Sequence, residues 1–168
     1  EAGGDASRFD VNGFWRHSIG SAFLAAAIAK NIAPKLEEDA FICGLLHDLG
    51  KFIMAQKAPA HIGKVLERVV NEDILFVEAE RQVLQYDHAQ LGSFVMEQWN
   101  RPVTLVNVVK SHHDPLSAPE ESRSLACITN AADIFARALL MGNGGDDRIP
   151  QLAADVWTTT GLDWKRLE

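Results

Sequence analysis

The spacing of apolar residues is the feature that most constrains the fold of this chain. Apolar residues recur at helical intervals throughout, and no stretch of useful length alternates with the two-residue period of a half-buried strand. Residues 14–32 are apolar nearly all round, as expected for a central helix packed on several sides. Further helices are expected over residues 36–49, 60–70, 74–85, 88–99, 103–113, 122–141 and 149–160. The pattern therefore predicts an all-α fold, a compact bundle of about eight helices.

Local signals set the expected helix boundaries. Gly50 reads as the stop of the helix at 36–49. Asp87, followed three residues later by Gln90, predicts a capping box at the start of the helix expected over residues 88–99. The first ten residues read as a flexible lead-in, and residues 142–148 as a polar loop. At 168 residues, the remainder (11–168) is expected to form a single domain.

Composition excludes several classes of function. A net charge of −7 without a basic stripe disfavours a nucleic-acid duplex as partner. No uncharged apolar run reaches about 18 residues, so no membrane span is expected. The start of the chain shows no signal-peptide pattern. Cys43 and Cys127 lie in apolar helical contexts without zinc or disulfide spacing, which fits a reducing compartment. We therefore expect a cytoplasmic protein.

The segment LLHDLGK, residues 45–51, places a histidine beside an aspartate at the end of an apolar helix. Burying such a pair is costly unless other groups pair with it. A surface turn is the alternative, but Leu45, Leu46 and Leu49 frame the pair and make that interpretation a poor fit. His47 and Asp48 are therefore candidates for a buried polar site, and an imidazole with a carboxylate suits a divalent metal.

Four more histidines lie where they could join this pair. His17 is in the first turn of an apolar helix, His88 follows the capping aspartate, and His112 and His113 end a helix. Taken singly, each has a simpler interpretation. His17 could be an ordinary core histidine and His88 an exposed first-turn residue. The pair at 112–113 could be protonated side chains that complement the negative C-terminus of a helix. His61, near a helix start among polar residues, is the exception.

Asp133 is the most informative carboxylate, because its helix interior is almost free of charge. Such a group needs a counter-charge. Arg137, four residues on, would supply it as a surface pair, and a metal ion would supply it in a buried site. Five histidines together with Asp48 and Asp133 predict one shared cation site, in which metal would neutralise the acids and satisfy the imidazoles. A helical scaffold with dispersed histidines is the remaining alternative.

Four segments, in order, resemble HDOD domains, which are bacterial signalling relatives of the HD-domain metal-dependent phosphohydrolases. They are FWRHS at 14–18, AFICGLLHDLGK at 40–51, YDHAQLG at 86–92 and SHHDP at 111–115. The resemblance covers residues 8–141. It implies that His17, His47, Asp48 and Asp133 hold one divalent ion.

Similarity to the related HD-GYP phosphodiesterases implies a second ion, held by His88, His112 and His113, with Asp48 as the bridge. Lys51 matches a lysine that assists near the substrate phosphate, so Lys51 and Asp48 are the expected catalytic residues. Asn130 and Thr129 are candidate partners of the ligands, and Arg16 and Lys110 further candidate cations.

Two departures from these families matter. The Gly-Tyr-Pro signature of the HD-GYP group is absent, so a cyclic dinucleotide substrate is not implied. HDOD proteins also carry a helical half before the Trp-Arg-His-Ser segment, so this chain resembles the HD half alone, as a fragment of a longer protein would.

Two functions follow from the resemblance. One is a metal-dependent phosphohydrolase or phosphodiesterase with one or two divalent ions (Fe, Mn, Ni, Co, Zn or Mg), acting on a phosphate-containing small molecule or nucleotide. The other is a non-catalytic regulatory module of signal transduction that binds a protein partner.

Overall fold

The computed structural model describes residues 9–146 and 148–160, and all regular secondary structure in these residues is helical. The all-α prediction is confirmed. The elements in chain order are α1 (Val11–Ile32), the 3-10 turn η2 (Pro34–Leu36), α2 (Glu37–Leu46), α3 (Leu49–Lys57), α4 (Pro59–Glu72), α5 (Phe76–Leu84), α6 (His88–Gln98), α7 (Val103–Ser111), the 3-10 turn η3 (Pro115–Ser117), α8 (Glu120–Ala138) and α9 (Ala154–Thr160).

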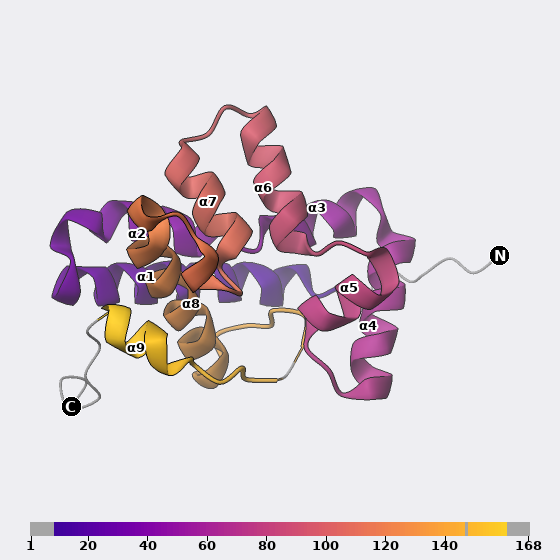
Figure 1. Ribbon diagram of the computed structural model, residues 1–168. Coiled ribbons are helices and arrows are strands. Elements are labelled where there is room, and N and C mark those ends of the chain that lie inside the picture. Colours follow the sequence, from indigo (N-terminus) through magenta and orange to yellow (C-terminus); the bar gives the residue numbers. More distant parts are fainter. Residues whose placement is uncertain (1–8, 147, 161–168) are drawn as a thin grey trace.

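The long helix α1 forms the base of the bundle, and both α2 and α8 pack against it. Helices α6 and α7 form an adjacent pair that rises above this base (Figure 1). At the other end, α4 packs on α5 and α3 connects them to α6. Helix α9 lies against α8. The lower ends of α6 and α7 reach the middle of the molecule (Figure 1), and α2 packs against α7.

Two clusters of buried apolar residues stabilise the bundle. The larger cluster joins α1, α2, α7 and α8, with Cys43, Val109 and Ile128 among its members. The smaller one joins the start of α1 to α3, α4 and α5 and includes Phe14 and Phe76. Helices from both clusters contribute side chains to the polar site described below, so apolar packing on both sides fixes its geometry.

The expected single helix over residues 36–49 with a stop at Gly50 is wrong. Helix α2 ends at Leu46, α3 begins at Leu49, and Gly50 lies inside α3. The glycine is needed for a close approach, because a Cβ there would lie 2.0 Å from the backbone oxygen of His88. The break places His47 and Asp48 at a helix junction, where both side chains can point toward the same interior point.

The two ends of the chain also differ from expectation. The last helix covers Ala154–Thr160, so residues 149–153 of the expected helix are not helical. Residues 1–8 of the expected lead-in lie outside the described residues. Phe9 is buried, and Asp10 caps α1 by accepting a hydrogen bond from the Gly13 backbone N–H. Among the described helices, none combines the length and apolarity needed to cross a membrane.

Candidate metal centre

The structure brings three predicted ligands, His17, His47 and Asp48, into one buried group with ligand atoms within 4.8 Å of one another. Asp48 Oδ2 lies 3.4 Å from His47 Nε2 and 3.8 Å from His17 Nε2. The fourth, Asp133 of α8, places Oδ1 3.0 Å from His17 Nε2 and 3.8 Å from His47 Nε2. We refer to these four residues as the α1 side of the centre.

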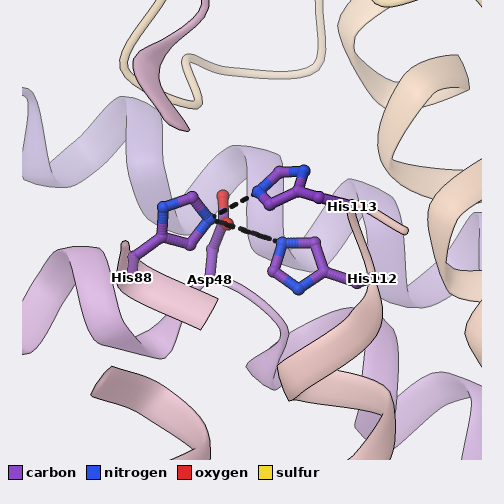
Figure 2. Close-up of side chains that lie close together, drawn as sticks. All are labelled: Asp48, His88, His112 and His113. Atoms are coloured by element: carbon purple, nitrogen blue, oxygen red, sulfur yellow. Dashed lines mark hydrogen bonds and ion pairs between the residues drawn. The ribbon is translucent and has the colours of Figure 1, made fainter. Parts of the chain in front are cut away.

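The second group consists of His88, His112 and His113 together with Asp48, again within 4.8 Å. Figure 2 shows the three rings converging on the aspartate. Asp48 Oδ1 lies 3.0 Å from His88 Nε2 and 3.6 Å from His112 Nε2. His88 Nε2 in turn lies 2.8 Å from His113 Nε2 and 3.4 Å from His112 Nε2. We refer to the three histidines as the α6 side, and Asp48 joins it to the α1 side.

Local structure explains how these rings come to point inward. Asp87 caps α6 and forms the expected capping box with Gln90, which makes His88 the first residue of the helix. His112 is the residue that caps the C-terminus of α7. Asn130 of α8 donates a side-chain hydrogen bond of 2.8 Å to the backbone oxygen of His112 and holds that turn in place. Helix ends thus position the α6 side, as the sequence suggests.

Hydrogen bonds at Nδ1 leave the other ring nitrogen free to act as a ligand. His47 Nδ1 lies 2.8 Å from the Gly44 oxygen, and His112 Nδ1 lies 2.8 Å from the Val109 oxygen. A carbonyl only accepts, so each Nδ1 carries the proton, and in the neutral ring Nε2 presents a lone pair. A lone pair at Nε2 with a bonded Nδ1–H is the arrangement of metal-binding histidines.

The donor set fits a divalent cation. The buried atoms His17 Nε2, His47 Nε2 and Asp48 Oδ1 have no hydrogen-bond partner of good geometry. Uncompensated buried polar atoms are costly, and three of them converge on the same interior region. Imidazole nitrogens mixed with carboxylate oxygens suit Fe, Mn, Co, Ni or Zn. The described residues therefore form a cluster that could bind metal.

Burial disfavours the charged form of an imidazole and so lowers its pKa, but at two positions in the centre neighbouring carboxylates outweigh that effect. At His47 the effect of Asp48 outweighs burial and raises the pKa. At His88, the charges of Glu80 and Asp48 together outweigh burial and raise the pKa. Burial prevails at His112 and lowers its pKa to about 4. The centre thus contains neutral and proton-attracting imidazoles side by side.

Two buried cations hold the carboxylates. Lys51 Nζ lies 2.7 Å from Asp48 Oδ2, and Arg137 Nε lies 3.0 Å from Asp133 Oδ1. Although burial acts to raise the pKa of each carboxyl, His47 and Lys51 hold the pKa of Asp48 well below its usual range, and Arg137 does the same for Asp133. Arg137 thus pairs with Asp133 as the simpler alternative expected, but the pair is buried and not at the surface, since the Arg137 side chain is only 6% exposed.

The segment after α8 covers the α1 side. Lys51 Nζ donates a 2.7 Å hydrogen bond to the backbone oxygen of Gly144. Asp146 accepts a hydrogen bond from Arg137 Nη1 at 2.9 Å and another from the Phe76 backbone N–H at 3.0 Å. Lys51, expected beside a substrate phosphate, is fully buried under this segment.

Other predicted residues fall outside the centre. Arg16 and Lys110 are exposed, and Thr129 is buried in α8; His61, the histidine expected to lie apart from the others, is exposed. Sequence reasoning missed Glu80 of α5, which is fully buried with Oε2 2.5 Å from His88 Nδ1. Its sequence context gave no signal, because Glu80 stands beside Arg81 on a short helix that carries several other charged residues.

Known proteins share this fold. An HDOD domain protein of Geobacter sulfurreducens superimposes with a TM-score of 0.82 at 21% identity, over 90% of this chain and 53% of that one. The MmoQ response regulator of Methylococcus capsulatus superimposes with a TM-score of 0.66 at 20% identity, over 96% of this chain and 61% of that one. At these identities, the likeness concerns the fold.

A curated relative, ribonuclease Y of Mycoplasma mycoides, is 29% identical over 117 residues, which is 70% of this chain and 20% of the relative. The chain thus spans about a fifth of that relative and between a half and two thirds of the two structures. The HDOD domain family matches residues 2–115. This chain therefore belongs to the HDOD family.

Proposed function

We propose that this HDOD domain is a metal-dependent phosphohydrolase or phosphodiesterase of bacterial signal transduction. The observation that carries the proposal is the sharing of Asp48 between two groups of histidines. Its Oδ2 faces His17 and His47, whereas its Oδ1 faces His88 and His112. One carboxylate between two imidazole sets is an arrangement suited to two bridged divalent ions.

The proposed roles follow from the contacts. His17, His47 and Asp133 would hold one ion, and His88, His112 and His113 the other, with Asp48 as a ligand to both. Ions held by these residues would supply an activated water as nucleophile and would offset charge on phosphate oxygens. Lys51, bonded to Asp48 and Gly144, would orient the bridging carboxylate and contribute positive charge to the centre.

A route for a substrate lies beside the α6 side. A cavity of about 280 Å³ is lined by His113 and Asp133 of the centre, and by Asn130 and the cationic Arg81. Each group of ligands contributes one residue to the lining of this cavity, so we propose that a phosphate ester approaches the centre from this side. We propose a phosphate-containing small molecule or nucleotide as the substrate class, and one relative's name, ribonuclease Y, supports a phosphodiester.

A second function, regulation by binding a protein partner, is favoured by a different observation. The α1 side is closed to solvent, because its ligands are buried and Lys51 is bonded to Gly144 of the segment that covers it. A closed centre would serve to stabilise a scaffold. The similarity in fold to a response regulator is in keeping with such a role.

Metal content and turnover together distinguish the two functions. Purified protein would be stripped with a chelator and reloaded with Mn²⁺, Fe²⁺, Co²⁺, Ni²⁺ or Zn²⁺. Hydrolysis of bis-p-nitrophenyl phosphate would then be measured for wild type, Asp48→Asn and Asp39→Asn. Asp39 is an exposed acid in the first turn of α2 and serves as the matched control.

The phosphoesterase proposal expects stoichiometric metal and turnover in wild type and Asp39→Asn, with both lost in Asp48→Asn. Metal bound without turnover of this ester or of a nucleotide phosphate favours the regulatory function. Absence of bound metal in the wild type contradicts a metal centre of either kind.

A further inference from the structure

Within the part of the chain that the structure describes, Glu80 is the one fully buried carboxylate in contact with a candidate ligand that the proposed roles leave unused. Its Oε2 lies 2.5 Å from His88 Nδ1 and 3.1 Å from the His88 backbone N–H, which donates to it. Both residues are fully buried. Two contacts from one oxygen fix the orientation of the His88 ring as well as the position of its backbone.

The contact differs in charge from those of the other histidines. Gly44 and Val109 offer neutral carbonyl oxygens to His47 and His112, whereas Glu80 offers a carboxylate. Charge-assisted hydrogen bonds are roughly twice as strong as neutral ones. A carboxylate at Nδ1 also makes the opposite nitrogen a more basic ligand. Among these three rings, His88 is thus expected to donate most strongly to a cation.

The burial of Glu80 argues against a role in helix capping alone. Within the described residues, its one ion pair is with His88, and its Oε1 is buried without a hydrogen-bond partner. Neutral caps satisfy a backbone N–H without the cost of burying a charge. A cation held at His88 Nε2 would compensate the Glu80 charge through the imidazole.

We propose that Glu80 is a positioning residue that keeps His88 protonated at Nδ1, with Nε2 directed at Asp48, and so sets the affinity of the α6 side for a divalent cation. The inference rests on the proposed metal-dependent function and adds to it a residue outside the predicted ligand set.

The test is a Co²⁺ titration of chelator-treated protein, followed by calorimetry and by the visible absorption of bound Co²⁺. The binding step that belongs to the α6 side is identified by its loss in His88→Gln. Glu80→Gln keeps the size and an accepting oxygen but removes the charge. Glu78→Gln makes the same chemical change two residues away on an exposed position of α5 and serves as the control.

We expect Glu80→Gln to weaken the His88-dependent step by about 10–100-fold. The other step and the Glu78→Gln titration should stay as in wild type. Equal weakening of both steps, or wild-type affinity in folded Glu80→Gln, would overturn the inference and leave the proposed function standing. A wild type that binds no Co²⁺ would overturn the proposed function itself.

A measurement on the wild type covers the case in which Glu80→Gln does not fold. Long-range ¹H–¹⁵N spectra of the Zn²⁺-loaded protein report which nitrogen of His88 carries the proton. Protonated Nδ1 with Nε2 as the ligating nitrogen is the expected result. Ligation through Nδ1 would contradict the assignment of Glu80, because the carboxylate and the metal would then compete for one atom.

Discussion

Gly50→Ala tests whether the close approach of α3 and α6 builds the centre. The added Cβ would lie 2.0 Å from the His88 backbone oxygen, where 3.4 Å is an ordinary contact, so the two backbones must separate by about 1.4 Å. Overpacking of this kind costs about 3 kcal/mol. The better helix propensity of alanine returns about 1 kcal/mol. The net loss of about 2 kcal/mol corresponds to a fall in Tm of about 4–8 °C for a domain of this size.

The consequence for the site follows from the same contact. Asp48 immediately precedes α3 and His88 begins α6, so separating the helices lengthens the 3.0 Å contact between Asp48 Oδ1 and His88 Nε2. Thermal unfolding followed by circular dichroism, with and without Co²⁺, measures both effects. Gly92→Ala is the control across the same contact, because its Cβ would first meet a Val109 side-chain carbon at 3.2 Å. A Gly50→Ala Tm within 2 °C of wild type, or a larger loss in Gly92→Ala, would refute the reasoning.

Two further substitutions test the charges of the centre. Arg137→Met leaves the buried carboxylates of Asp133 and Asp146 without their cation and should lower the free energy of unfolding by about 3–5 kcal/mol, as measured by urea denaturation. A loss below about 1 kcal/mol would contradict this. Burial lowers the pKa of His112 to about 4, so between about pH 6.5 and 4 the unfolded chain takes up a proton that the folded protein does not. Stability should fall as the pH drops through that window, by up to about 1.4 kcal/mol per pH unit for this group. His112→Asn should flatten that slope, and an unchanged slope would show that other groups cause it.

The helical fold and the positions of His88 and His112 at helix ends were predictable, because both depend on local signals, whereas His17, expected in the first turn of its helix, lies in the second turn of α1. The apolar spacing indicates the helices, and Asp87 with Gln90 marks the start of α6, which is confirmed. Helix ends alone do not show that the rings converge. The prediction of a shared site came from the number of histidines and acids in apolar surroundings, and the resemblance to the family then divided them into two sets of ligands.

Features decided by distant contacts were not predictable. Gly50 resembles a helix stop, but its role is set by the backbone of His88, which belongs to another helix. Lys51 carries no mark of burial, because its partner Gly144 lies 93 residues away. Glu80 stands between a polar and an apolar neighbour on a short helix, and its burial depends on how α5 packs near α6. In each case the residue's role is set by an atom of a distant segment that packs against it. The spacing of apolar residues along one helix does not reveal such a contact.

The balance of buried charge links the structure to the proposed chemistry. Among the described residues around the histidines, five carboxylates (Asp48, Glu80, Asp87, Asp133 and Asp146) face three cations, Lys51, Arg81 and Arg137. The deficit of two positive charges explains why the pKa values of His47 and His88 are raised, since two imidazolium ions would close it. One divalent ion closes it equally well and leaves the imidazoles neutral, as ligands must be. Two divalent ions would carry four positive charges, two more than the deficit. A hydroxide and a singly charged phosphate ester would then restore neutrality. A centre with this charge balance is therefore suited to hold its second ion most strongly when an anionic substrate is bound.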